Sequence, residues 1–223
     1  MFIGHLAAGL ASKKISNSLS LAMMFIAAQF LDLLWPILVL LGIETVRIEE
    51  GITKLIPLDF TYYPYSHSLL MVIVWSMIFG LIYLVITKNR QNALILGGLV
   101  LSHWVLDLLV HRPDLPLTPF SDYKVGLGLW NYPFVEIIVE LALFFAGTYF
   151  YFTSKRPKKK IAFWSLIGFL LIIQFMNFFG PLPPDVNSIA WGGNMMWLLI
   201  IWAWWIEREN KTIKSAAMDS SKH

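Results

Sequence analysis

The chain has 223 residues, of which 57% are hydrophobic and only 14% are charged. Charged residues are about half as frequent as in an average soluble domain, so this composition excludes an ordinary soluble globular protein and favours a single integral membrane domain. The net charge of +3 is small and favours contact with a membrane surface over binding to nucleic acid. The chain has no cysteine, which excludes disulfides, thiolate metal ligands and cysteine nucleophiles.

The chain begins with an apolar stretch over residues 2–12, which is too short to cross a bilayer. We expect this stretch to form a short helix that dips into the membrane and packs against the first span. The sequence predicts an all-α integral membrane bundle of six transmembrane helices plus this half-inserted helix, in one domain over residues 1–206, followed by a polar cytoplasmic tail over residues 207–223. The six predicted spans are residues 17–43, 67–87, 91–111, 133–152, 161–180 and 188–206.

The loops between the predicted spans alternate between basic ones and ones that are acidic or nearly neutral. The loop over residues 44–66, for example, holds four acidic and two basic residues. Basic loops stay on the cytoplasmic side of a membrane, so we expect a multi-pass protein of the inner membrane with both termini in the cytoplasm. The basic residues that mark this side are Lys13, Lys14, Lys88, Arg90, Lys155, Arg156, Lys158, Lys159, Lys160, Arg208, Lys211, Lys214 and Lys222.

Three ionisable residues, His103, Asp107 and His111, are spaced four apart in and at the end of the third span. This spacing advances about 40° per step on an α-helix, so the three side chains share one stripe. Imidazole and carboxylate groups together suit a transition metal, and ionisable groups at membrane depth usually serve a function. The two histidines are separated by roughly 12 Å of helical rise, so one ion cannot span both. His103 with Asp107 is one possible ion site, and Asp107 with His111 is a second that shares the same carboxylate.

Other polar side chains are predicted to reach the same depth, in the outer half of the bundle. Asp32 lies inside the first span and His67 opens the second, while Glu136 and Glu140 lie four residues apart in the outer half of the fourth. Independent placement would scatter these groups, so their common depth indicates one site.

His5 is predicted to lie at a different depth from Asp32. On a straight helix it stands about 12 Å above Lys13, whereas Asp32 stands about 22 Å above residue 17. The two side chains then miss each other unless the N-terminal helix is tilted, a cytoplasmic cavity reaches mid-membrane, or the helix boundaries differ by several residues from those predicted.

The polar motifs resemble those of a family of membrane-bound, metal-dependent hydrolases described as LexA-binding and inner-membrane-associated. Their order is also similar to that of zinc-dependent phospholipase C. The resemblance covers roughly residues 1–115 and implies hydrolysis of a phosphate ester by a metal-activated water, with His5 as a further ligand. The motifs that carry it are Gly4-His5-Leu6-Ala7-Ala8-Gly9, Asp32, Tyr65-Ser66-His67-Ser68 and His103-Trp104-Val105-Leu106-Asp107.

Together these patterns predict a membrane-embedded hydrolase that uses one or more ions of zinc, or of another divalent transition metal, on a phosphoester or ester of a lipid-like substrate. A carboxylate, Glu140 or Asp114, is expected to move the proton. Membrane lipids are the expected partners, nucleic acid is not, and the oligomeric state stays open. The predicted metal ligands are His5, Asp32, His67, His103, Asp107 and His111.

Several alternatives remain open at this point. The intramembrane acids and histidines also suit a proton- or cation-coupled transporter, and a non-catalytic binding protein with a structural metal is a third class. At the level of single residues, His103 and Asp107 could form a buried pair that only stabilises helix packing. His111 could be an ordinary interfacial residue, and Glu136 could simply favour the dipole of its helix.

Overall fold

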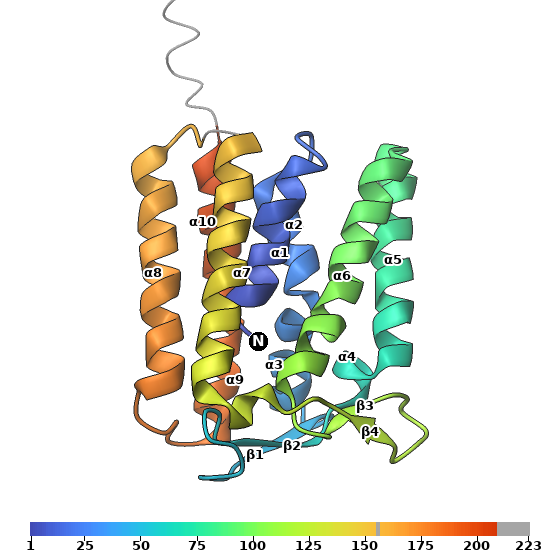
Figure 1. The fold of residues 1–223 in the computed structure, drawn as a ribbon. Helices are drawn as coiled ribbons and strands as arrows, with labels where there is room; N and C mark the ends of the chain where they lie inside the picture. Colours follow the sequence, from blue (N-terminus) through green and yellow to red (C-terminus); the bar gives the residue numbers. More distant parts are fainter. Residues whose placement is uncertain (155–156, 209–223) are drawn as a thin grey trace, which may run out of the picture.

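The computed structural model of the protein describes residues 1–154 and 157–208. Its helices run side by side between two ends of the molecule (Figure 1), which confirms the predicted all-α bundle. The predicted tail over residues 207–223 lies almost wholly outside the described residues. The helices are α1 (Ile3–Ala11), α2 (Leu21–Ala28), α3 (Phe30–Leu40), α4 (Pro64–His67), α5 (Leu69–Thr87), α6 (Arg90–Val110), α7 (Pro133–Ser154), α8 (Lys160–Phe179), α9 (Val186–Asn194) and α10 (Met196–Glu207), with 3-10 turns η1 (Ser12–Lys14) and η2 (Leu129–Asn131).

Polar side chains define where several of the helices begin. Ser20 caps α2 by accepting a hydrogen bond from Met23 N, and Ser68 caps α5 in the same way. Asn89 caps α6, and Asp185 caps α9. Each cap satisfies a backbone N–H that has no partner within its own helix.

Five helical segments in the described residues are long and apolar enough to cross a membrane. They are α5, α6, α7, α8 and the continuous pair α9 and α10, and α2 with α3 makes a sixth if that pair is taken as one span. All six predicted stretches therefore have counterparts. The difference lies in the first one, which was predicted as a single span and is bent by 56° between α2 and α3.

The bend between α2 and α3 falls at Gln29, which is buried inside the bundle. The Gln29 side chain donates a hydrogen bond from Nε2 to the carbonyl of Phe2, 3.3 Å away. The span also begins later than predicted, since α2 starts at Leu21. Both differences change the depth at which Asp32, in the first turn of α3, enters the bundle.

Helix α1 begins at mid-height in the bundle and packs along α7 (Figure 1), so the predicted short N-terminal helix is present. Its main partner is α7 and not the first span, with which it makes a smaller contact through α2. Gly147 of α7 permits this close approach, because a Cβ atom there would lie only 2.5 Å from the carbonyl oxygen of Ala7. The Glu140 carboxylate holds the start of α1 by accepting hydrogen bonds from the backbone N–H groups of Phe2 and Gly4.

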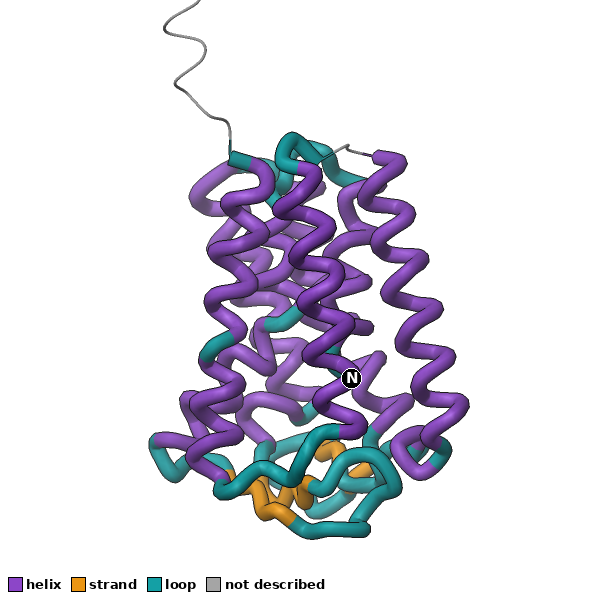
Figure 2. Tube along the Cα trace, turned by 90° about the vertical axis from the view of Figure 1, so that its left-hand side faces the viewer, coloured by secondary structure: helices purple, strands orange, loops and turns teal. Residues whose placement is uncertain are grey.

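The two ends of the bundle differ. Two short antiparallel hairpins cover the end at which α6 finishes and α7 begins (Figures 1 and 2). The loops that join α1 to α2 and α5 to α6 lie at the opposite end, where α7 ends and α8 begins. The hairpins fall in segments that were predicted as loops: β1 (Thr45–Ile48) pairs with β2 (Leu58–Tyr62), and β3 (Leu115–Pro116) pairs with β4 (Lys124–Val125).

Candidate metal site

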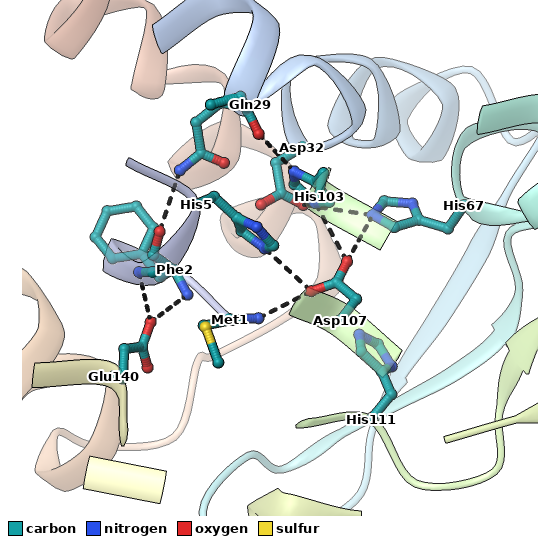
Figure 3. Close-up of polar contacts among 12 residues, drawn as sticks. Met1, Phe2, His5, Gln29, Asp32, His67, His103, Asp107, His111 and Glu140 are labelled. Atoms are coloured by element: carbon teal, nitrogen blue, oxygen red, sulfur yellow. Dashed lines mark hydrogen bonds and ion pairs between the residues drawn. The ribbon is translucent and has the colours of Figure 1, made fainter. Parts of the chain in front are cut away.

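Five of the predicted ligands meet inside the bundle, in the arrangement that Figure 3 shows. His5 comes from α1, Asp32 from α3, His67 from the end of α4, and His103 and Asp107 from α6. Four of these side chains are almost fully buried, whereas 26% of the Asp32 side chain is exposed. The cluster is therefore enclosed except on the side of Asp32.

Asp107 lies between the three histidines. Its Oδ1 lies 3.0 Å from Nε2 of His5, and its Oδ2 lies 3.2 Å from Nε2 of His103 and 3.8 Å from Nε2 of His67. Asp32 faces two of the same rings, with its Oδ1 3.5 Å from Nε2 of His67 and 3.6 Å from Nε2 of His103. These contacts form two sets of three ligand atoms, and within each set all atoms lie within 4.8 Å of one another. The first set is His5, His103 and Asp107, and the second is Asp32, His67 and His103.

The outer nitrogens of two histidines are held by the protein. Nδ1 of His103 donates to the carbonyl of Ala28, at 2.8 Å, where α2 ends before the bend. Nδ1 of His67 lies 2.7 Å from the hydroxyl oxygen of Ser66. Because a carbonyl only accepts, the proton of a neutral His103 ring sits on Nδ1 and leaves a lone pair on Nε2.

The surroundings of the lone pair on Nε2 of His103 indicate whether the residues fit a metal. Nε2 of His103 is buried and has no hydrogen-bond partner in the described part of the chain, although it points at two carboxylates. A lone pair and two acceptors facing one another repel unless a proton or a cation lies between them. Imidazole and carboxylate ligands with buried Nδ1 partners are the usual surroundings of a zinc-type ion, so the residues fit such an ion.

Glu44 supports His67 through Ser66, a role that the sequence did not indicate. Oε2 of Glu44 accepts a hydrogen bond of 2.6 Å from the Ser66 hydroxyl, and Oε1 accepts the backbone N–H groups of Tyr65 and Ser66. Since the hydroxyl donates to Glu44, its oxygen is free to accept the proton of His67 Nδ1. Burial raises the pKa of the Glu44 carboxyl, and these hydrogen bonds oppose that effect.

His5 reaches the cluster in spite of its predicted depth. Its ring stacks on that of His103, with 3.5 Å between the ring centroids and 5° between the planes. The N-terminal amino group of Met1 also lies inside the bundle, 3.0 Å from Oδ1 of Asp107. The later start of α2 and the bend at Gln29 both change the depth of Asp32 relative to that expected for a straight span.

His111 and Asp114 lie in a separate polar network. Helix α6 ends at Val110 and the backbone of His111 is extended, so the four-residue stripe stops before His111. Its Nδ1 contacts Oδ1 of Asp114 at 2.9 Å, and Nε of Arg112 lies 3.0 Å from Oδ2 of the same carboxylate. Neither residue belongs to the two ligand sets found among the described residues.

Tyr63 completes this network next to His111 and Asp114. Its hydroxyl lies 3.3 Å from Nδ1 of His111 and 3.4 Å from Oδ1 of Asp114. Burial, reinforced by the negative charge of Asp114, holds the pKa of Tyr63 well above its ordinary value. The phenol therefore stays neutral and serves as a hydrogen-bond donor.

Glu140, the other predicted proton carrier, has both oxygens engaged away from the ligand sets. Oε1 accepts from Phe2 N at 2.6 Å and from Gly4 N at 3.1 Å (Figure 3). Oε2 accepts from Nε2 of Gln174 at 2.8 Å. The carboxylate thus anchors α1, and with it His5, against α7.

Fold and site together describe a helical membrane protein with a buried cluster of three histidines and two aspartates. The family model of the YdjM inner membrane proteins matches residues 1–180, a range that contains all five cluster residues. The chain belongs to this family. No curated protein and no solved structure matches it.

Proposed function

We propose that this protein is a membrane-embedded, metal-dependent hydrolase that cleaves a phosphoester or ester bond in a lipid-like substrate. The observation that carries the proposal is the convergence of three imidazole Nε2 atoms on the carboxylates of Asp32 and Asp107. Most ionisable clusters at membrane depth serve a function, and this one has the donor types that zinc and related ions prefer.

The five cluster residues would hold the ion, with Asp107 able to face two positions through its separate oxygens. When bound, a divalent transition metal supplies Lewis acidity, which makes water a nucleophile near neutral pH and polarises the ester oxygen. His67 and His103 are kept in one tautomer and one orientation by Ser66 and by the Ala28 carbonyl. The ligand atoms are therefore positioned before any ion arrives.

The exposure of Asp32 supports a route by which a substrate enters. Its side chain is 26% exposed, while His103 and Asp107 are almost inaccessible. Basic loops mark the cytoplasmic side of a membrane, so we infer that the end of the bundle covered by the two hairpins faces outward. The cluster then lies in the outer half of the inner membrane. A lipid-like molecule then reaches the site from the outer side, past Asp32.

Hydrolysis by purified protein in detergent tests the proposal, because no gradient exists there for a carrier to use. A panel of lipid-like phosphoesters and esters should be cleaved in a metal-dependent way, and His103→Ala should abolish this cleavage. His111→Ala is the matched control, because this histidine is also buried but lies in the Asp114 network. Absence of any metal-dependent cleavage, or equal loss in both variants, would contradict the proposal.

A cation-coupled transporter is the second candidate, and the broken span favours it. Transporters place ion sites at interrupted helices, and Asp32 follows directly on the 56° bend between α2 and α3. Such a protein would show substrate-dependent proton or ion flux in sealed vesicles, lost in Asp32→Asn. Flux of this kind without hydrolysis in detergent would favour the carrier over the hydrolase.

A further inference from the structure

Glu136 is a buried acid outside the two ligand sets of the described residues. It lies on α7, one turn before Glu140, and is fully buried. No donor within residues 1–154 and 157–208 reaches either of its carboxyl oxygens. An ionised carboxylate is strongly disfavoured in this state, so Glu136 is stable only as a neutral acid or beside a cation.

Glu140 is in the opposite situation. Its two oxygens accept three N–H donors, from Phe2, Gly4 and Gln174. Two of these donors belong to the first turn of α1, whose N-terminal end also favours negative charge. The ionised form of Glu140 is therefore the stabilised one.

Glu136 and Glu140 are four residues apart on α7, so their side chains are neighbours on the same face of the helix. Two ionised carboxylates can only accept hydrogen bonds, and two negative charges at this separation repel strongly. A single proton on Glu136 removes both difficulties, because the protonated acid donates to Glu140.

This pair of acids lies beside the candidate metal site without being part of it. Glu140 accepts the backbone N–H of Gly4, the residue before His5. The amino group of Met1 lies 3.0 Å from Oδ1 of Asp107 and makes no hydrogen bond to Glu136. Glu136 makes no hydrogen bond to any of the five cluster side chains in the described part of the chain. Glu136 can therefore carry a proton without acting as a metal ligand in either of the two ligand sets.

We propose that Glu136 carries a proton in the resting protein, shares it with Glu140 and acts as the acid of the site. The role of Glu136 as an acid rests on the proposed hydrolase function, whereas the shared proton does not. As the ester bond breaks, Glu136 gives its proton to the leaving oxygen, which departs as an alcohol. The attacking water adds its oxygen to phosphorus or carbon, and the proton that it loses restores the acid on Glu136.

Infrared spectroscopy of the purified protein tests the shared proton directly, because a carboxylic acid has a carbonyl stretch that a carboxylate lacks. The wild type at neutral pH should show this band, Glu136→Gln should lose it, and Glu136→Asp should keep it at a shifted position. Asp114→Asn is the control and should leave the band unchanged, because Asp114 is paired with Arg112 and His111. A wild type without the band, or a band that persists in Glu136→Gln, would overturn the proposal.

Metal content and turnover test the role of that proton. Glu136→Gln should keep the metal content and melting temperature of the wild type, while hydrolysis falls by about 10²- to 10⁴-fold, as expected for loss of a general acid. Loss of metal would make Glu136 a ligand, and unchanged turnover would remove it from the chemistry; either result overturns the acid role. A wild type that shows the band but no hydrolysis would refute the hydrolase while the shared proton stands.

Discussion

Replacement of Gly147 by alanine should loosen the candidate site from a distance, because this glycine sets how closely α1 approaches α7. A Cβ atom at position 147 would lie 2.5 Å from the oxygen of Ala7, and an ordinary contact begins near 3.4 Å. The two helices must therefore separate by about 0.9 Å. His5, two residues before Ala7, is 3.0 Å from Asp107, and metal ligands tolerate deviations of only about 0.2 Å.

The expected cost of Gly147→Ala is about 1–3 kcal/mol of stability, the usual range for overpacking a tight interior contact. Metal affinity should fall as well, since His5 moves with α1. Thermal unfolding and metal titration of purified protein measure the two effects. Gly98→Ala is the matched control, because nothing lies within 4 Å of a Cβ atom there. Equal stability and metal affinity in the two variants would refute the inference that α1 places His5 through Gly147.

Two further predictions concern the support of His67 and the sidedness of the bundle. Ser66→Ala should weaken metal binding by about 10- to 100-fold, the usual effect of losing a group that orients a ligand. Ser102→Ala is the control and should keep the affinity, because its hydroxyl donates to the carbonyl of Leu99 in its own helix. Titration with zinc distinguishes the two variants, and equal affinities would remove the role assigned to Ser66. Cysteine introduced at Asp122 should react with a membrane-impermeant thiol reagent added to intact cells, while cysteine at Lys160 should not, because basic loops mark the cytoplasmic side. The reverse labelling pattern would place the cluster in the inner half of the membrane.

Hydropathy predicted the helical fold well, because a helix that crosses a bilayer needs a long apolar stretch whatever its neighbours are. It could not predict the break at Gln29, where one buried amide bonds to the carbonyl of Phe2, far away in the sequence. The hairpins were missed for a similar reason. Their strands are two to five residues long and acquire their pairing only in the folded chain.

The site shows the same division between local and long-range information. The spacing of His103 and Asp107 on one helix predicted that they act together, and the structure brings them within 3.2 Å. The same spacing placed His111 with them, but α6 ends one residue too early. Glu44 gave no local signal, because it supports His67 only through Ser66 across the fold.

The metal content of the purified, chelator-free protein tests whether the five cluster residues hold an ion. We predict at least one zinc-like ion per chain. It should be lost, together with thermal stability, in His103→Ala and in Asp107→Ala, because a bound ion stabilises the folded state by mass action. Wild-type protein that contains no metal, and whose melting temperature does not change on treatment with a chelator or with added zinc, would contradict this prediction.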